Sequence, residues 1–266
     1  IQEQFFDIGA NLTHKSFEAD LDDVISKAQE SGVNRFSITG SSLNESISAI
    51  EIAKKFPNSC ISTAGIHPHN AKEYSPSSFS EIRNLLEEDV VKSIGETGLD
   101  FYRNFSAAKQ QELSFEAHLE LAIETRYPLF LHERDAHKRF IEIISPYKED
   151  LPKSVVHCFT GNKDALEKYI EMGFYIGITG WLCDERRGKH LIDLIPIIPL
   201  DKLMIETDCP YLLPRDMGID NSTRNEPQFL KHIAGRIAEI RPESKELLFS
   251  AIYMNSLDFF DVTFQE

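Results

Sequence analysis

Long apolar runs are absent from this sequence, and no stretch approaches the ~18 to 20 residues that cross a bilayer. The first residues, IQEQFFDIGANLT, also lack a basic segment followed by a long apolar one, which is the pattern of a secretory signal. Nothing in the sequence therefore indicates a membrane partner, and we expect a cytoplasmic protein.

Cysteine is scarce, and its four copies show no C-x-x-C pair and no regular spacing. A disulfide framework or a structural zinc site usually needs such pairs. We therefore expect free thiols and neither kind of cross-link. The cysteines are Cys60, Cys158, Cys183 and Cys209.

Positive charge is also in short supply. The chain has 28 Lys and Arg against 43 Asp and Glu, which gives a formal net charge of −15 at pH 7. This balance repels a polyanion at long range, so it excludes a protein that coats nucleic acid through a general basic surface. A phosphate-bearing substrate has to be captured locally. Part of the negative charge fits a metal site, because clustered carboxylates are neutralised when divalent cations bind.

A glycine-rich phosphate loop is missing after the first apolar run, where DIGANL stands, and its absence disfavours an open doubly wound sheet. What the chain does contain is a regular alternation of short apolar runs with helical patterns, which predicts βαβ units and a parallel sheet. Eight such units most naturally close into a TIM (β/α)8 barrel of the metal-dependent hydrolase type, a fold of ~250 residues. The expected strands are 4–9, 35–39, 60–65, 91–96, 128–132, 154–158, 174–178 and 203–207. The expected helices are 20–31, 43–55, 77–88, 106–125, 135–146, 163–172 and 187–194.

No linker-like or low-complexity stretch interrupts this pattern, so we expect one domain over residues 1–266. After the eighth strand, a long loop leads to two more helical patterns near 226–240 and 243–260. We expect these extra helices to pack on the outside or at the bottom of the barrel.

Four of the expected strands end in a residue that a divalent metal would bind. These residues are Glu96, His132, His157 and Asp208. In a parallel barrel the carboxyl ends of all strands meet on one face, where active sites are assembled. Four such residues at the same end are hard to explain structurally, because buried and unpartnered they would cost several kcal/mol. The pattern therefore predicts a metal site.

Imidazole and carboxylate together suit Mg²⁺, Mn²⁺, Zn²⁺ or iron, with oxygen ligands favouring the first two. Such an ion activates a bound water and polarises the bond that this water attacks. Asp208 is a candidate metal ligand and a candidate general base. Asp7 and Asn11 follow the first strand and His67 and His69 the third, so they are expected at the same face. The remaining histidines have no such convergence and are interpreted as surface residues: His14, His118, His137, His190 and His232.

Several strings along the chain resemble the successive signatures of the TatD family of metal-dependent DNases. They are DIGANLT, TAGIHPH, IGETGLDFYRNFS, FLHERDAH, VVHCFTG, YIGITGWLCDERRG and IETDCPYLLPRD, and the resemblance runs from about Phe6 to Asn255. It implies a TIM barrel of the amidohydrolase type, dependence on a divalent metal, and hydrolysis of phosphodiester bonds. The family often acts as a 3′→5′ exonuclease that prefers single strands, so the implied partner is DNA, with RNA as a further substrate.

Position by position, the resemblance makes Glu96, His132, His157 and Asp208 metal ligands, with Glu96 shared between two ion positions. It places His67 against the scissile phosphate and makes Asp208, Glu96 and His67 the catalytic residues. Most family members carry D-x-H-x-H on the first strand, whereas this chain has Asp7, Gly9 and Asn11. One branch of the family has the same reduced strand. The expectation is one strong ion position, with Mg²⁺ favoured and Mn²⁺ or Zn²⁺ as alternatives, beside one weak position.

Substrate contacts are expected from Asn11 and His67 and from arginines on loops above the site, since a guanidinium holds a phosphate through two hydrogen bonds. Arg103 and Arg134 are the leading candidates, beside Arg186, Arg187 and Arg215; Phe101, Tyr102 and Trp181 could stack on bases.

Two other functions are compatible with the same barrel. One is a metallo-hydrolase that cuts an ester, lactone or amide, including an aminoacyl ester on tRNA. The other is a barrel kept only as an interaction module. We expect a monomer in each case.

Overall fold

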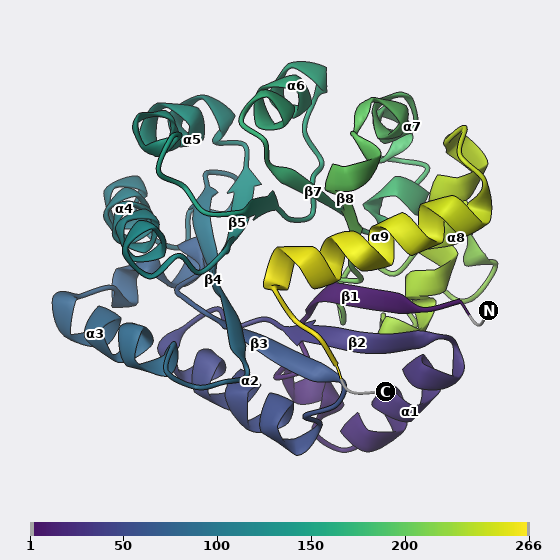
Figure 1. The fold of residues 1–266 in the computed structure, drawn as a ribbon, viewed down its shortest axis with the longest axis horizontal. Coiled ribbons are helices and arrows are strands. Elements are labelled where there is room, and N and C mark those ends of the chain that lie inside the picture. Colours follow the sequence, from purple (N-terminus) through teal and green to yellow (C-terminus); the bar gives the residue numbers. More distant parts are fainter. Residues whose placement is uncertain (1–2, 265–266) are drawn as a thin grey trace.

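The computed structural model describes residues 3–264, which form eight parallel strands in the order β1 to β8, as shown in Figure 1. The strands are β1 (Phe5–Ala10), β2 (Val33–Ile38), β3 (Cys60–Ala64), β4 (Val91–Asp100), β5 (Leu129–Arg134), β6 (Ser154–Val156), β7 (Tyr175–Ile178) and β8 (Leu203–Ile205). The helices are α1 (Leu21–Glu30), α2 (Leu43–Lys55), α3 (Pro76–Leu85), α4 (Ala108–Thr125), α5 (His137–Ile144), α6 (Lys163–Glu171), α7 (Lys189–Leu194), α8 (Leu230–Ile240) and α9 (Lys245–Phe260). The predicted (β/α)8 barrel is confirmed, with element ends that differ by a few residues.

The barrel closes just beyond the last strand, where the chain returns to β1. The Asp208 amide donates to the Gly9 carbonyl at 2.9 Å, and the Asn11 amide donates to the Cys209 carbonyl at 3.0 Å. Below them, the fully buried Asp7 carboxylate accepts hydrogen bonds from the amide and hydroxyl of Thr207. Asp7 therefore joins the first strand to the end of the last one.

Apolar side chains fill one end of the barrel. They form a buried cluster of Phe6, Ile8, Ile61, Phe130, Val155, Tyr175, Met204, Phe259 and Phe260. The last two belong to α9, which lies across the barrel opening in Figure 1. Burying a phenylalanine contributes roughly 1.5 to 3 kcal/mol, so α9 is a plug that stabilises this end. The expectation that the two extra helices pack on the outside or at the bottom of the barrel is confirmed for α9 at the bottom.

Strand β4 is longer than predicted, because it continues four residues past Glu96. A register shift against β5 lies between Gly95 and Thr97, and β5 approaches closely here: a Cβ on Gly98 would lie 1.9 Å from the His132 carbonyl oxygen. Gly95 and Gly98 have φ angles of 143° and 145°, which L side chains rarely adopt. This bulge extends the strand and brings both Glu96 and Asp100 to the barrel mouth, the carboxyl end of the strands.

His118 is not a surface residue, so that interpretation was wrong. It is fully buried on α4, where its Nε2 accepts from the Ile66 amide at 3.0 Å and its Nδ1 lies 2.6 Å from the Ser114 carbonyl oxygen. Burial lowers the pKa of His118 to about 4. This histidine fixes the loop that carries His67.

Within residues 3–264, no helix combines the length and the apolar character that crossing a membrane requires.

Candidate metal centre and active site

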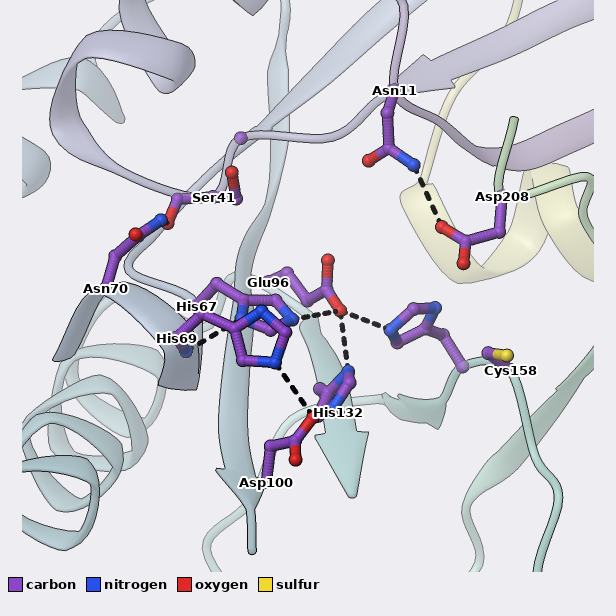
Figure 2. A network of polar contacts seen from close by, with 12 residues as sticks. Asn11, Ser41, His67, His69, Asn70, Glu96, Asp100, His132, Cys158 and Asp208 are labelled. Carbon is purple, nitrogen blue, oxygen red and sulfur yellow. Dashed lines mark hydrogen bonds and ion pairs between the residues drawn. The ribbon is translucent and has the colours of Figure 1, made fainter. Parts of the chain in front are cut away.

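One carboxylate oxygen is the centre of the barrel mouth. Oε1 of Glu96 lies 2.5 Å from Nε2 of His157, 2.9 Å from Nδ1 of His132 and 3.2 Å from Nε2 of His67. Glu96 and His132 lie within β4 and β5, His67 and His157 follow β3 and β6, and all four side chains are at most slightly exposed. Figure 2 shows these contacts converging on Glu96. The fold thus brings together three of the four predicted ligands, with His67 beside them.

A second carboxylate, Asp100, lies behind this cluster. Its Oδ2 is 3.0 Å from Nε2 of His132 and 3.0 Å from Nε2 of His69, while its Oδ1 accepts from the amides of Tyr102 and Arg103. His132 is therefore held at both ring nitrogens, by Glu96 on one side and Asp100 on the other. Carboxylates that orient a histidine in this way are common around metal sites.

A third carboxylate holds His157 from below. Oε1 of the fully buried Glu206 lies 2.8 Å from Nδ1 of His157 and accepts from the Cys158 amide at 2.9 Å. Its other oxygen, Oε2, is buried without a hydrogen-bond partner among the described residues. A Cβ added at Gly9 would lie 3.2 Å from this oxygen, so Glu206 occupies the space toward which a side chain at position 9 would point.

Asp208 stands apart from the Glu96 cluster. Its Oδ1 accepts from Nδ2 of Asn11 at 2.9 Å, and Figure 2 shows this pair on the far side of Glu96 from Asp100. With Gly9 lacking a side chain, the region between Glu96 and Asp208 offers few ligand groups. The expectation of one strong ion position beside one weak one stays a prediction.

The electrostatics of the cluster favour a cation at its centre. Burial alone would raise the pKa of Glu96, but the adjacent His157 and His67 rings outweigh it and hold that pKa well below its usual value. Burial likewise opposes protonation of His157, yet Glu96 and Glu206 raise the pKa of that imidazole well above its usual value. The carboxylate thus requires positive charge beside it, which protons supply in one state and a metal ion would supply in another.

Two other groups titrate in unusual ranges. Burial lowers the pKa of His67 to about 4, so this ring is neutral near pH 7, and its Nδ1 accepts from the His69 amide at 2.9 Å. Burial, with help from the nearby carboxylates of Glu96 and Glu206, raises the pKa of Asp208 to about 7. A carboxyl group with such a pKa can both accept and release a proton near neutral pH.

The donor set fits a divalent cation. Ligand atoms of His67, Glu96 and His132 all lie within 4.8 Å of one another, and His157 contacts the same Glu96 oxygen. Neutral imidazoles and an ionised carboxylate are ligands for Zn²⁺, Mn²⁺ and, through the oxygen, Mg²⁺. Binding would displace the protons that now join these side chains.

Aromatic and guanidinium groups alternate on the loops beside the mouth. The Arg134 guanidinium lies 3.9 Å from the ring centroid of Tyr102 and 5.7 Å from that of Trp181, which Arg187 covers at 4.0 Å. Arg103 lies 5.6 Å from the Tyr102 ring, and Tyr102 is 57% exposed. We refer to these five side chains as the aromatic–arginine ladder.

The predicted arginines fall into two groups. Arg186, Arg187 and Arg215 all pair with the buried Asp184, so ion pairing accounts for their positions. Among residues 3–264, the guanidinium groups of Arg103 and Arg134 lie over aromatic rings and form no ion pair with a carboxylate. Arg103 and Arg134, the two leading candidates for phosphate contacts, thus differ from the other three arginines in having no carboxylate partner among the described residues.

Sequence reasoning missed Asp100 and Glu206. The sequence held a signal for each. Asp100 lies four residues after Glu96, which in a continuous strand places both side chains on one face. Glu206 directly follows the apolar run LMI and stands two residues before Asp208.

A barrel whose mouth holds imidazoles around a carboxylate defines the class of metal-dependent hydrolases. The chain belongs to the TatD-related DNase family, whose profile matches residues 6–261. It is 46% identical over 260 residues to the 3′-5′ ssDNA/RNA exonuclease TatD of Salmonella typhimurium, covering 97% of this chain and 100% of that protein.

Solved structures agree with this family. The TatD homologue YJJV of Escherichia coli has a TM-score of 0.91 at 23% identity, covering 99% of this chain and 100% of that one, which shows a common fold. A TatD-family hydrolase from Entamoeba histolytica has a TM-score of 0.85 at 30% identity, covering 97% and 98% of the two chains.

Proposed function

We propose that this chain is a metal-dependent exonuclease that hydrolyses phosphodiester bonds of single-stranded DNA, and of RNA, from the 3′ end. The observation that carries the proposal is the Glu96-centred cluster in a chain of the TatD family. The Salmonella typhimurium relative, which is named as a 3′-5′ ssDNA/RNA exonuclease, supports the polarity and the single-stranded substrate.

Glu96, His132 and His157 would hold the ion, with Asp208 at the weaker second position beside Glu96. Mg²⁺ is the proposed physiological ion because the shared carboxylate offers a hard oxygen, and Mn²⁺ or Zn²⁺ would also suit the imidazoles. When bound, such an ion supplies a Lewis acid that polarises the phosphoryl group and lowers the pKa of the attacking water. The Asp100 and Glu206 carboxylates fix the orientation of the two histidine rings.

Asp208 is the proposed general base. Its pKa of about 7 suits a group that takes a proton from water and returns it to the leaving group. Asn11 donates to one oxygen of Asp208, which leaves the other oxygen for the water. Glu96 and His67 complete the proposed catalytic set, with His67 placed against the scissile phosphate as a neutral ring.

The aromatic–arginine ladder is the proposed binding surface for the single strand. Arg103 and Arg134 would meet phosphates, and the exposed Tyr102 ring would stack on a base at ~1 to 3 kcal/mol per base. Asn11 would add a contact at the other side of the mouth. Local cationic groups of this kind are needed because the net charge of −15 repels the substrate at long range.

We also propose that the chain works as one domain over residues 1–266, as a monomer, in the cytoplasm. Its four cysteines are unpaired thiols, as expected in a reducing compartment.

The test is a cleavage assay in which oligonucleotides labelled at either end are compared with small carboxylic esters, each with and without Mg²⁺. We expect early loss of a 3′ label from single strands, dependence on the metal, and negligible ester hydrolysis. Faster turnover of an ester or of an aminoacyl-tRNA would instead establish the alternative hydrolase. Metal-independent cleavage would refute both.

A further inference from the structure

We propose that Cys183, Asp216 and His232 form a second metal site that takes a thiophilic divalent cation such as Zn²⁺. This site is separate from the Glu96 cluster and lies between the loops that follow β7 and β8 and the helix α8.

The three side chains come from separate segments of the chain. Cys183 ends the 3-10 turn Gly180–Cys183 after β7, Asp216 lies in the 3-10 turn Arg215–Met217 after β8, and His232 lies in the first turn of α8. One ligand atom from each lies within 4.8 Å of the others. The sequence spacing of the cysteines predicted no structural zinc, because that argument considers only cysteine pairs and cannot see a lone cysteine meeting a histidine in space.

The geometry is close to what an ion requires. Ligands at Zn–N and Zn–S distances of about 2.0 to 2.3 Å stand roughly 3.3 to 3.8 Å apart in a tetrahedron. Nε2 of His232 lies 2.5 Å from Oδ1 of Asp216, so these two groups would separate by about 1 Å as the ion replaces the proton between them. Both side chains are about one-third exposed, so solvent rather than packed protein borders part of each.

Burial and charge distinguish the three ligands. Cys183 is 4% exposed, so its sulfur would form the inner wall of the site, while the exposed side leaves a fourth position for water. Oδ2 of Asp216 faces Nε of Arg236 at 3.8 Å, and that Nε has no hydrogen-bond partner among the described residues. Arg236 can therefore hold the outer oxygen of the carboxylate while the inner one binds the ion.

The donor chemistry selects the cation. A thiolate with an imidazole and a carboxylate favours Zn²⁺ over Mg²⁺, which prefers oxygen ligands and retains its waters. The bound ion would cross-link the turn that carries Trp181 to the turn that carries Arg215. It would thereby fix one end of the aromatic–arginine ladder.

Titration with Co²⁺ tests this site, because only a thiolate ligand gives an intense near-ultraviolet charge-transfer band. We expect a saturable band with the intensity of one thiolate–cobalt centre per chain, which disappears when excess Zn²⁺ is added. Cys183→Ser should abolish it, and His232→Gln should weaken Co²⁺ binding at least tenfold without removing the thiol. The matched control is Cys158→Ser, because Cys158 is the thiol beside the Glu96 cluster and its loss should leave the band intact.

The proposal is overturned if the wild-type protein shows no band, if the band survives Cys183→Ser, or if Cys158→Ser removes it. It is also overturned if a folded His232→Gln protein binds Co²⁺ through a thiolate as tightly as the wild type does. The readout does not depend on nuclease activity, so it can fail while the proposed function stands.

Discussion

Glu206 and His157 form a buried pair in which the carboxylate Oε1 lies 2.8 Å from the imidazole Nδ1, leaving Nε2 directed at Glu96. The pair fixes the ring orientation and the nitrogen that is presented to a metal. We predict that Glu206→Gln lowers metal affinity and cleavage by roughly 10- to 100-fold, because the ring loses its charged partner but the shape is kept. Calorimetric Mn²⁺ binding and initial cleavage rates would measure both. Unchanged affinity would show that the pair is only structural.

Removing a proposed metal ligand should lower cleavage far more than removing Glu206, which only orients one of the ligands. Glu96→Ala and His157→Ala should each lower cleavage by roughly 10³-fold or more, since each deletes a proposed direct ligand. Circular dichroism and thermal unfolding should show an intact barrel, because the apolar plug at the other end is untouched. Full activity in either folded variant contradicts the proposed mechanism.

The ladder makes a prediction about binding rather than chemistry. Arg134→Ala should raise KM for a single-stranded oligonucleotide roughly tenfold with little change in kcat, as expected for loss of ~1 to 3 kcal/mol of stacking and phosphate contact. Arg139→Ala is the matched control, because Arg139 lies on α5, pairs with Glu112 and is not part of the aromatic–arginine ladder. Equal effects of the two substitutions would remove the ladder from the substrate path.

His118 gives a prediction about stability and pH. Its folded pKa is about 4, below the ordinary 6.5, so the unfolded state binds the extra proton first as pH falls. Its contribution to stability is therefore complete above pH 6.5 and is lost as pH drops toward 4, by roughly 3 kcal/mol in total.

His118→Gln keeps an acceptor and a donor but cannot titrate. The free energy of unfolding of the wild type minus that of this variant should shrink as pH falls from 6.5 to 4.5, as measured by denaturant titration. The subtraction removes contributions from other groups, such as Asp7, whose raised pKa acts in the opposite direction. A difference independent of pH would contradict the buried neutral histidine.

The sequence could predict which candidate ligands would gather at the carboxyl ends of the barrel strands. Glu96, His132 and His157 each follow an apolar run, and parallel strands bring such positions together. Asp100 escaped prediction because β4 was expected to stop at Glu96, and only the close approach of β5 at Gly98 shows why the strand continues.

Two further cases show which features helical spacing can predict and which depend on the folded chain. His118 shares one face of α4 with Phe115, Leu119 and Ala122, so its burial could have been predicted from helical spacing. The meeting of Cys183, Asp216 and His232 could not, because two loops and a helix of the folded barrel set their distances.

The most direct test of the account is anomalous scattering from crystals grown with Mn²⁺. We predict a strong peak within bonding distance of Oε1 of Glu96 and of the His132 and His157 rings, with at most a weaker one between Glu96 and Asp208. Absence of a peak at Glu96 in a protein that cleaves DNA under the same conditions would contradict the central claim.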